Sequence, residues 1–303
     1  DIASKVNAVA VQSFPSIDPA GSKDCYLFRA TAATTDADTV AKVATLKSDA
    51  RVFSASHNKL YYKDGFKQGS GTATYTPNDP RFNEQWDKQV MHTPAAWTLS
   101  KGSANVAVCV IDTGVDIDHP EFQGRLLAGF DVTGTTVTND PRPTTGNDHG
   151  THVAGIIMAN GDNGTGIAGV SFQNSKLVAI KTGTDSGGFT TAALVAAFTQ
   201  VQLVQKANPG YRYVINASLG SNVPTGYDFS ADPWALSILS TVKLDIVCCF
   251  AAGNDGASGN AEHFPADMAP VDPRILCIAS CGPNLEHSFF SSFHSYTTVT
   301  GPG

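Results

Sequence analysis

Continuous apolar runs alternate with amphipathic stretches along residues 76–303. The runs do not alternate in polarity, which is the pattern of strands buried on both faces. They occupy residues 105–112, 176–182, 213–220, 245–253 and 274–280. Residues 189–207 and 233–244, which lie between runs, have the spacing and composition of helices. Strands that alternate with helices predict a parallel central sheet and an α/β fold.

Residues 1–75 have a different pattern. An apolar stripe through residues 36–49 predicts one helix, and residues 50–62 then have the composition of a strand. Residues 63–75 are rich in Gly, Ser and Thr, which is typical of an exposed linker. We therefore predict two domains, residues 1–75 and residues 76–303.

Composition excludes several classes of function. The chain has 303 residues, a formal charge of −7 and a pI near 5.5. This acidic balance argues against nucleic-acid binding, which needs clustered Lys and Arg. No run approaches the ~18 apolar residues of a membrane span. The first residue is Asp1, which indicates a processed chain or a fragment. Most of the six cysteines lie in apolar runs, so we predict buried thiols rather than zinc ligands. The sequence does not decide whether two of the cysteines form one disulfide.

Polar residues that suit acyl transfer follow several of the predicted strands. Asp112 ends the first run, Ser218-Leu219-Gly220 end the third, and Asn254 follows the fourth. Sites in parallel sheets form at the carboxyl ends of the strands, where these residues can converge with His149. These residue types suit acyl transfer. The Asp orients the His, the His moves a proton, and the Asn amide stabilises the oxyanion. Each residue by itself also has a purely structural interpretation. Asp112 is typical of a turn residue, and Asn254 is typical of a helix cap.

The stretch "NDHGTHVAGI" contains two histidines, His149 and His152, at the start of an apolar helix. A metal site of the His-Glu-x-x-His kind would have a Glu between them, whereas Gly150 and Thr151 stand there. Small residues at a helix start favour close backbone approach instead. We predict that His149 is the working base and that His152 is a buried, hydrogen-bonded support.

Two other motifs suggest rival chemistries. "DTG" at Asp112 and "DSG" at 185–187 resemble the paired carboxylates of aspartic peptidases, but their surroundings do not match as a dyad requires. "GTGIAG" at 164–169 fits a dinucleotide fingerprint and would favour an oxidoreductase. That fingerprint should follow a strand and open a helix, whereas this one follows a helix and leads into a strand.

These motifs together resemble the subtilisin-like serine peptidases, particularly the thermitase and proteinase K groups. The matching stretches are "TPNDPRFNEQW", "VIDTGVDIDHPEFQGR", "NDHGTHVAGI", "NGTGIAGV", "INASLG", "AAGNDG" and "GPG". The resemblance implies a three-layer subtilisin-like fold with a parallel central sheet. It implies a serine endopeptidase that cleaves polypeptides through an Asp-His-Ser triad and an acyl-enzyme.

The resemblance also implies roles for single residues. Asp112 and His149 match the catalytic pair, and Asn254 matches the oxyanion donor. Ser218, Leu219 and Gly220 match one wall of the substrate cleft and its S1 pocket, and Ser186 and Gly187 match the opposite wall. Gly220 is expected to keep one pocket wall open for large apolar P1 side chains. Asp255 is expected at the pocket rim, where it would favour Lys or Arg modestly.

The family's nucleophile lies in Gly-Thr-Ser-Met-Ala, shortly after the match to "GPG" at 301–303. No serine of residues 1–303 has that context. We therefore expect residues 1–303 alone to lack the nucleophile and to show no turnover. The alternative is a truncated or degenerate relative that only binds peptides.

Residues 1–75 resemble the last helix and strand of a family propeptide, with its first strand missing or diverged. The resemblance implies a secreted, monomeric enzyme made as a zymogen, whose own α+β propeptide inhibits it. Cleavage is expected between Lys63 and Thr76.

A structural Ca²⁺ is expected at the glycine-rich stretch "NGDNGTGIAG" (160–169), because its match in thermitase-like relatives binds this ion. Hard cations take several oxygens, including carboxylates and loop carbonyls. The expected ligands are the side chains of Asp79, Glu121 and Asn163 and the carbonyls of Asn160, Thr165 and Ile167.

Overall fold

The computed structural model describes residues 8–14, 25–30, 42, 45–46, 48, 74–184 and 188–303. The chain divides into two compact units, Asp1–Gly71 and Thr72–Gly303. In the first unit, strands β1 (Ala8–Phe14) and β2 (Cys25–Ala30) pair antiparallel, with a register shift between Ala10 and Gln12. The sequence pattern had not indicated this strand pair. Most of the helix and strand predicted over 36–62 lies outside the described residues.

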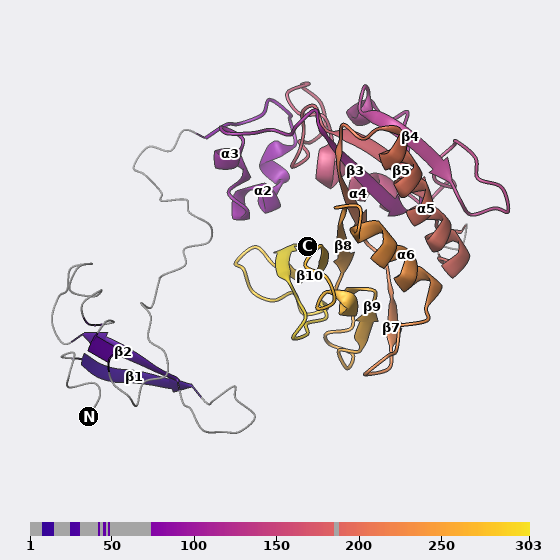
Figure 1. Cartoon of the computed structure of the whole chain (residues 1–303). Helices are drawn as coiled ribbons and strands as arrows, with labels where there is room; N and C mark the ends of the chain where they lie inside the picture. Colours follow the sequence, from indigo (N-terminus) through magenta and orange to yellow (C-terminus); the bar gives the residue numbers. More distant parts are fainter. Residues whose placement is uncertain are drawn as a thin grey trace. The chain divides into compact units, whose positions relative to one another are not determined.

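The second unit is built on a parallel sheet of seven strands in the order β11-β10-β8-β6-β3-β5-β4 (Figure 1). This confirms the predicted α/β class. The strands are β3 (Val106–Asp112), β4 (Leu126–Asp131), β5 (Lys176–Lys181), β6 (Arg212–Ala217), β8 (Val247–Ala251), β10 (Ile275–Cys281) and β11 (Val299–Pro302). The apolar runs had indicated β3, β5, β6, β8 and β10, but not the two edge strands.

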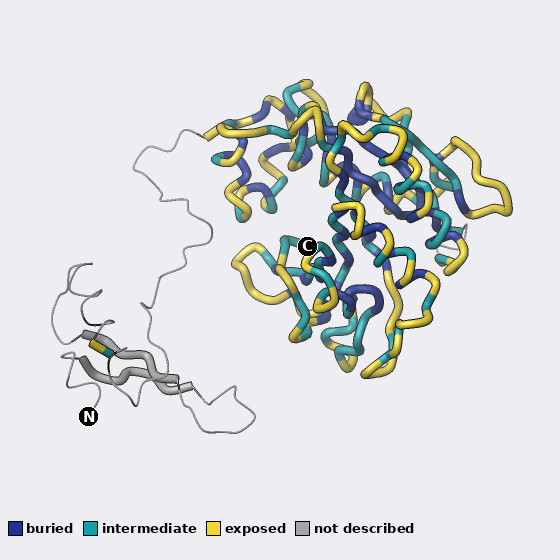
Figure 2. The backbone as a smooth tube through the Cα atoms, in the orientation of Figure 1, coloured by how far each residue is buried: buried dark blue, intermediate teal, exposed yellow. Residues whose placement is uncertain are grey.

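Helices cover both faces of the sheet. Side chains of α5 (Thr191–Ala207) and α6 (Pro233–Val242) pack with one set of strand residues in the largest core cluster. Helix α4 (His149–Met158) packs through Ala154 and Met158 against the other face, on Val108 and Val110. Figure 2 shows buried residues along the strands and exposed ones around them. Because strand residues are covered on both sides, their runs are continuously apolar.

Smaller elements complete the unit. The described helical turns are η3 (Phe82–Glu84), α2 (Trp86–Val90), α3 (Thr93–Ala96), η4 (Pro120–Phe122) and η5 (Ala266–Met268). Strands β7 (Ser221–Val223) and β9 (Glu262–Phe264) pair antiparallel outside the main sheet. Within the described part of the chain, no helix is long and apolar enough to span a membrane. Cys109, Cys248, Cys277 and Cys281 are buried free thiols, and Cys249 is a partly buried one.

Candidate active site

Asp112 and His149 meet at the carboxyl end of β3. Asp112 is fully buried as the last residue of the strand, and His149 is the first residue of α4. The His149 Nδ1 atom lies 2.7 Å from Asp112 Oδ1. A carboxylate oxygen accepts, so Nδ1 carries the proton and Nε2 is the free nitrogen. The hydrogen bond to Asp112 raises the pKa of His149, although partial burial of the ring opposes this shift.

Gly150 allows the helix start to approach the strand end. A Cβ at this position would lie 2.3 Å from the Gly114 carbonyl oxygen and 2.9 Å from Asp112 Cβ. The Gly150 N–H also donates to Thr113 Oγ1 at 3.0 Å, and the Thr113 N–H donates to Asp112 Oδ1 at 2.7 Å. Any side chain at residue 150 would therefore push His149 away from its carboxylate.

The prediction for His152 was wrong. This residue is exposed, and it lines a separate pocket of about 650 Å³ together with His119 and Arg142. The α4 residues that pack against the sheet include Ala154 and Met158, and His152 is not among them.

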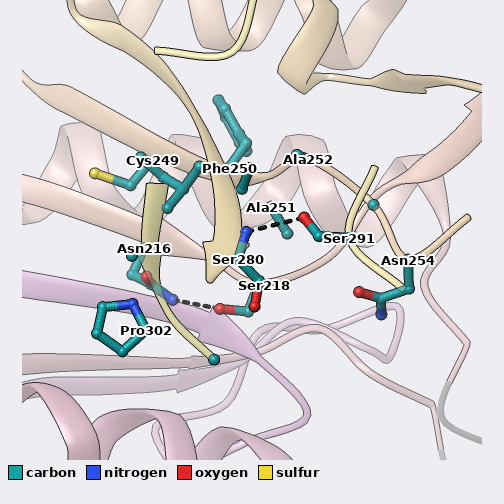
Figure 3. Close-up of a pocket in the computed structure, with 15 residues that line it drawn as sticks. Asn216, Ser218, Cys249, Phe250, Ala251, Ala252, Asn254, Ser280, Ser291 and Pro302 are labelled. Carbon is teal, nitrogen blue, oxygen red and sulfur yellow. Dashed lines mark hydrogen bonds between the residues drawn. The ribbon is translucent and has the colours of Figure 1, made fainter. Parts of the chain in front are cut away.

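The expected substrate-binding residues lie on loops after two adjacent strands. Ser218 follows β6 and Asn254 follows β8, and both line a pocket of about 270 Å³ (Figure 3). The Asn216 amide donates to Ser218 Oγ at 2.9 Å (Figure 3). Asn254 is exposed, so its amide is free to meet a ligand. The Leu219 side chain is buried in the largest core cluster.

Gly220 does not open a pocket wall as expected. A Cβ at Gly220 would lie 2.3 Å from Nε2 of His263, so an imidazole ring occupies the space beside it. Asp255 is partly exposed, and its N–H donates to Ser292 Oγ at 3.0 Å. Ser186 and Gly187 lie outside the described residues, as does Asp185 of the rival "DSG" motif.

Two buried carboxylates lie at the expected calcium site. Asp79 and Glu121 are 4% and 5% exposed. Burial raises the pKa of Glu121, hydrogen bonds from Asn163 and Ile167 oppose this shift, and the charge of Asp79 adds to it. Asp79 Oδ1 and Glu121 Oε1 are buried without a hydrogen-bond partner, although unpaired buried carboxylate oxygens are costly. A Cβ at Gly166 would lie 2.1 Å from Glu121 Oε1, so the glycine backbone closes over this oxygen. These oxygens fit a hard cation.

Two of the other expected ligands, Asn163 and Ile167, contact the Glu121 carboxylate. The Asn163 amide donates to Glu121 Oε2 at 2.9 Å, and its Oδ1 accepts from the Thr165 N–H at 3.0 Å. The Ile167 backbone also hydrogen-bonds the Glu121 carboxylate. The Asn160 side chain faces away, because its Oδ1 accepts from Arg125 at 2.9 Å. Among the described residues no three His, Cys, Asp or Glu side chains gather at one point, so amide and carbonyl oxygens would complete the shell.

Sequence reasoning had not found the residues that hold this loop to the start of the unit. Tyr75 donates its hydroxyl to Asp162, the Asp162 N–H donates to Asp79 Oδ2 at 2.8 Å, and the Gly164 N–H donates to Asn78 Oδ1 at 2.8 Å. Each contact joins residues more than 80 positions apart. Local patterns carry no signal for such pairs.

Comparison with known proteins identifies the family. A model of the subtilase family matches residues 103–303. The chain belongs to the subtilase family. Thermitase of Thermoactinomyces vulgaris is 34% identical over 230 residues, which cover 76% of this chain and 74% of thermitase. The thermophilic serine proteinase of Bacillus sp. (strain AK1) is 33% identical over 76% of this chain and 52% of that protein.

Solved structures of this family share the fold. The psychrophilic subtilisin-like protease Apa1 of Pseudoalteromonas sp. AS-11 is 25% identical with a TM-score of 0.57, over 72% of this chain and 45% of that one. A cold adapted subtilisin-like serine proteinase is 27% identical with a TM-score of 0.52, over 67% of this chain and 65% of that one. This chain thus spans about half the length of two of these four relatives.

Proposed function

We propose that this subtilase is a serine endopeptidase that hydrolyses polypeptides through an acyl-enzyme. The observation that carries the proposal is the 2.7 Å bond between His149 and a fully buried Asp112. Asp112 would hold the imidazole with its proton on Nδ1, so that Nε2 accepts the proton of a serine hydroxyl. The same Nε2–H would then protonate the leaving amine, and a water activated by His149 would release the acyl group.

The nucleophile in this proposal is the serine of the family motif Gly-Thr-Ser-Met-Ala, which residues 1–303 do not contain. The proposal therefore concerns the protein expressed from its complete reading frame. A fluorophosphonate probe should label that protein, and casein should be cleaved. A protein that binds peptides without labelling or cleavage would instead be a peptide-binding relative.

Asn254 is the proposed oxyanion donor. Its exposed amide follows the carboxyl end of β8, on the same side of the sheet as Asp112 at the carboxyl end of β3. Asn254→Ala should lower kcat by about 10²–10³ with little change in KM, since the bond strengthens only in the transition state. The matched control is Asn105→Ala, an exposed residue just before the amino end of β3. A change confined to KM would place Asn254 in ground-state binding.

We also propose that Ca²⁺ binds at Asp79 and Glu121 and supplies the charge that balances their buried carboxylates. Ca²⁺ at 100 times its Kd stabilises a folded protein by about 2.7 kcal/mol. For a domain of this size, each kcal/mol of lost stability lowers the Tm by about 2–4 °C. Removal of Ca²⁺ by EDTA should therefore lower the Tm by roughly 5–10 °C. The readout is calorimetry at pH 7.

A variant pair tests the Ca²⁺ ligands. Glu121→Gln should abolish the effect of EDTA on Tm, whereas Glu84→Gln, at an exposed residue that pairs with Arg81, should retain it. Because burial raises the pKa of Glu121, the effect of Ca²⁺ should also weaken as the pH falls. An EDTA effect that survives in Glu121→Gln would exclude this site.

We propose that the part of residues 1–75 that precedes the mature N-terminus acts as an inhibitory propeptide of a secreted, monomeric zymogen. An extracellular protease of Xanthomonas campestris is among the relatives. The Tyr75 N–H donates a hydrogen bond to the Pro94 carbonyl oxygen at 2.9 Å. The Tyr75 ring stacks on the Phe172 ring, with their centroids 6.0 Å apart. The mature N-terminus should therefore fall after Lys63 and at or before Tyr75. Mass spectrometry of the active protein measures it, and a start beyond Tyr75 would contradict this boundary.

A further inference from the structure

The His263 ring lies between two backbone segments that belong to different strand ends. A Cβ built on Gly220 would lie 2.3 Å from His263 Nε2, and a Cβ built on Gly253 would lie 2.9 Å from its Nδ1. Gly220 follows β6 and Gly253 follows β8, and these strands are neighbours in the sheet. We call the space between Gly220 and Gly253 the 220/253 slot; the imidazole fills it.

The ring is held in the 220/253 slot. His263 lies opposite Asn222 in the β7–β9 pair, and its Nδ1 donates to Asn222 Oδ1 at 3.1 Å. The N–H of His263 donates to the Tyr296 hydroxyl at 3.2 Å, which fixes the backbone. Burial lowers the pKa of His263, which favours the neutral ring, although the negative charge of Asp255 partly opposes this shift.

The 220/253 slot adjoins the proposed oxyanion donor. Gly253 precedes Asn254, whose amide would hold the carbonyl oxygen of the scissile bond. The Cα that carries the P1 side chain is bonded directly to that carbonyl carbon, so the side chain must enter space beside Asn254. Glycines on both sides give walls without side chains of their own, and His263 supplies the side chain between them.

We propose that His263 makes this enzyme specific for small P1 side chains such as Ala, because its imidazole takes the space that a large P1 side chain would need. This inference rests on the proposed peptidase function and names the substrate class of that site. It reverses the expectation of large apolar P1 residues, which assumed an open wall at Gly220.

The test measures kcat/KM for tetrapeptide anilides that differ only at P1, with Ala, Leu or Phe, on the protein expressed from its complete reading frame. The unmodified enzyme should cleave the Ala substrate at least about 10-fold better than the Phe substrate, since one surplus methylene group already costs about 10–200-fold. His263→Ala should raise the ratio of Phe to Ala cleavage by at least about 10-fold. His287→Ala, at an exposed histidine whose ring contacts Phe293, is the matched control and should leave the ratio unchanged.

Each outcome decides the inference. An active enzyme that cleaves Phe as well as Ala at P1, or an active His263→Ala variant with an unchanged ratio, overturns the role of His263 and leaves the peptidase function standing. If His263→Ala does not fold, the P1 profile of the unmodified enzyme decides. An unmodified protein that cleaves no peptide and binds no fluorophosphonate overturns both proposals.

Discussion

Replacing His149 by alanine is expected to lower kcat of the complete enzyme by about 10⁶, as loss of the triad histidine does in a subtilisin. Without the imidazole no group accepts the serine proton, and only substrate binding and the oxyanion donor continue to contribute. The measurement is single-turnover cleavage of a chromogenic peptide, with folding verified by circular dichroism.

His152→Ala is the matched control, because it removes the same ring from the same helix, three residues further on. His152 is exposed and lines a different pocket, so kcat should change less than about 3-fold. Equal losses in the two variants would mean that both histidines act together, as in a metal site, and would contradict the assignment of His149 as the sole base.

Asp112→Asn is expected to lower kcat by about 10⁴ at pH 7 while the fold is retained. An Asn amide can donate to Nδ1 and thereby stabilise the tautomer that carries its proton on Nε2. In that tautomer Nε2 is unable to take the serine proton. Combining Asp112→Asn with His149→Ala should cost no more than His149→Ala alone, because the two residues act as one unit.

The pH profile gives a second readout of Asp112. Activity requires neutral His149, so kcat/KM should rise with pH through the pKa of this histidine, which the hydrogen bond to Asp112 raises above about 6.5. In Asp112→Asn the midpoint should move to lower pH, because the carboxylate that stabilises the imidazolium is gone. Asp118→Asn, at an exposed residue that pairs with Arg142, should leave the midpoint in place. A midpoint unaffected by Asp112→Asn would contradict the hydrogen bond as its cause.

Strand and helix content followed from local patterns where burial was complete. The runs at β3, β5, β6, β8 and β10 are apolar on both faces because helices cover the sheet on both sides. Strands β4 and β11 lie at the two edges, where their residues are intermediate or exposed. β11 is only four residues long, and the apolar run of β4 was not recognised as a strand. The ends of α5 and α6 were predicted to within two residues. Asp232 caps α6 by accepting from the Trp234 and Ala235 N–H groups.

The sequence by itself determined the α/β class, the family motifs and the residue types at the strand ends. All strands of a parallel sheet run in the same direction, so their carboxyl ends lie on one side of the sheet. Asp112, Ser218 and Asn254 could therefore be assigned to that side from the sequence. The tertiary structure alone decided that His152 is exposed, why Gly150 must be glycine, and that His263 fills the space beside Gly220. Periodicity reports how deeply a residue is buried within its own element. It carries no information about which distant side chain occupies the space next to a glycine, because that depends on how separate loops pack.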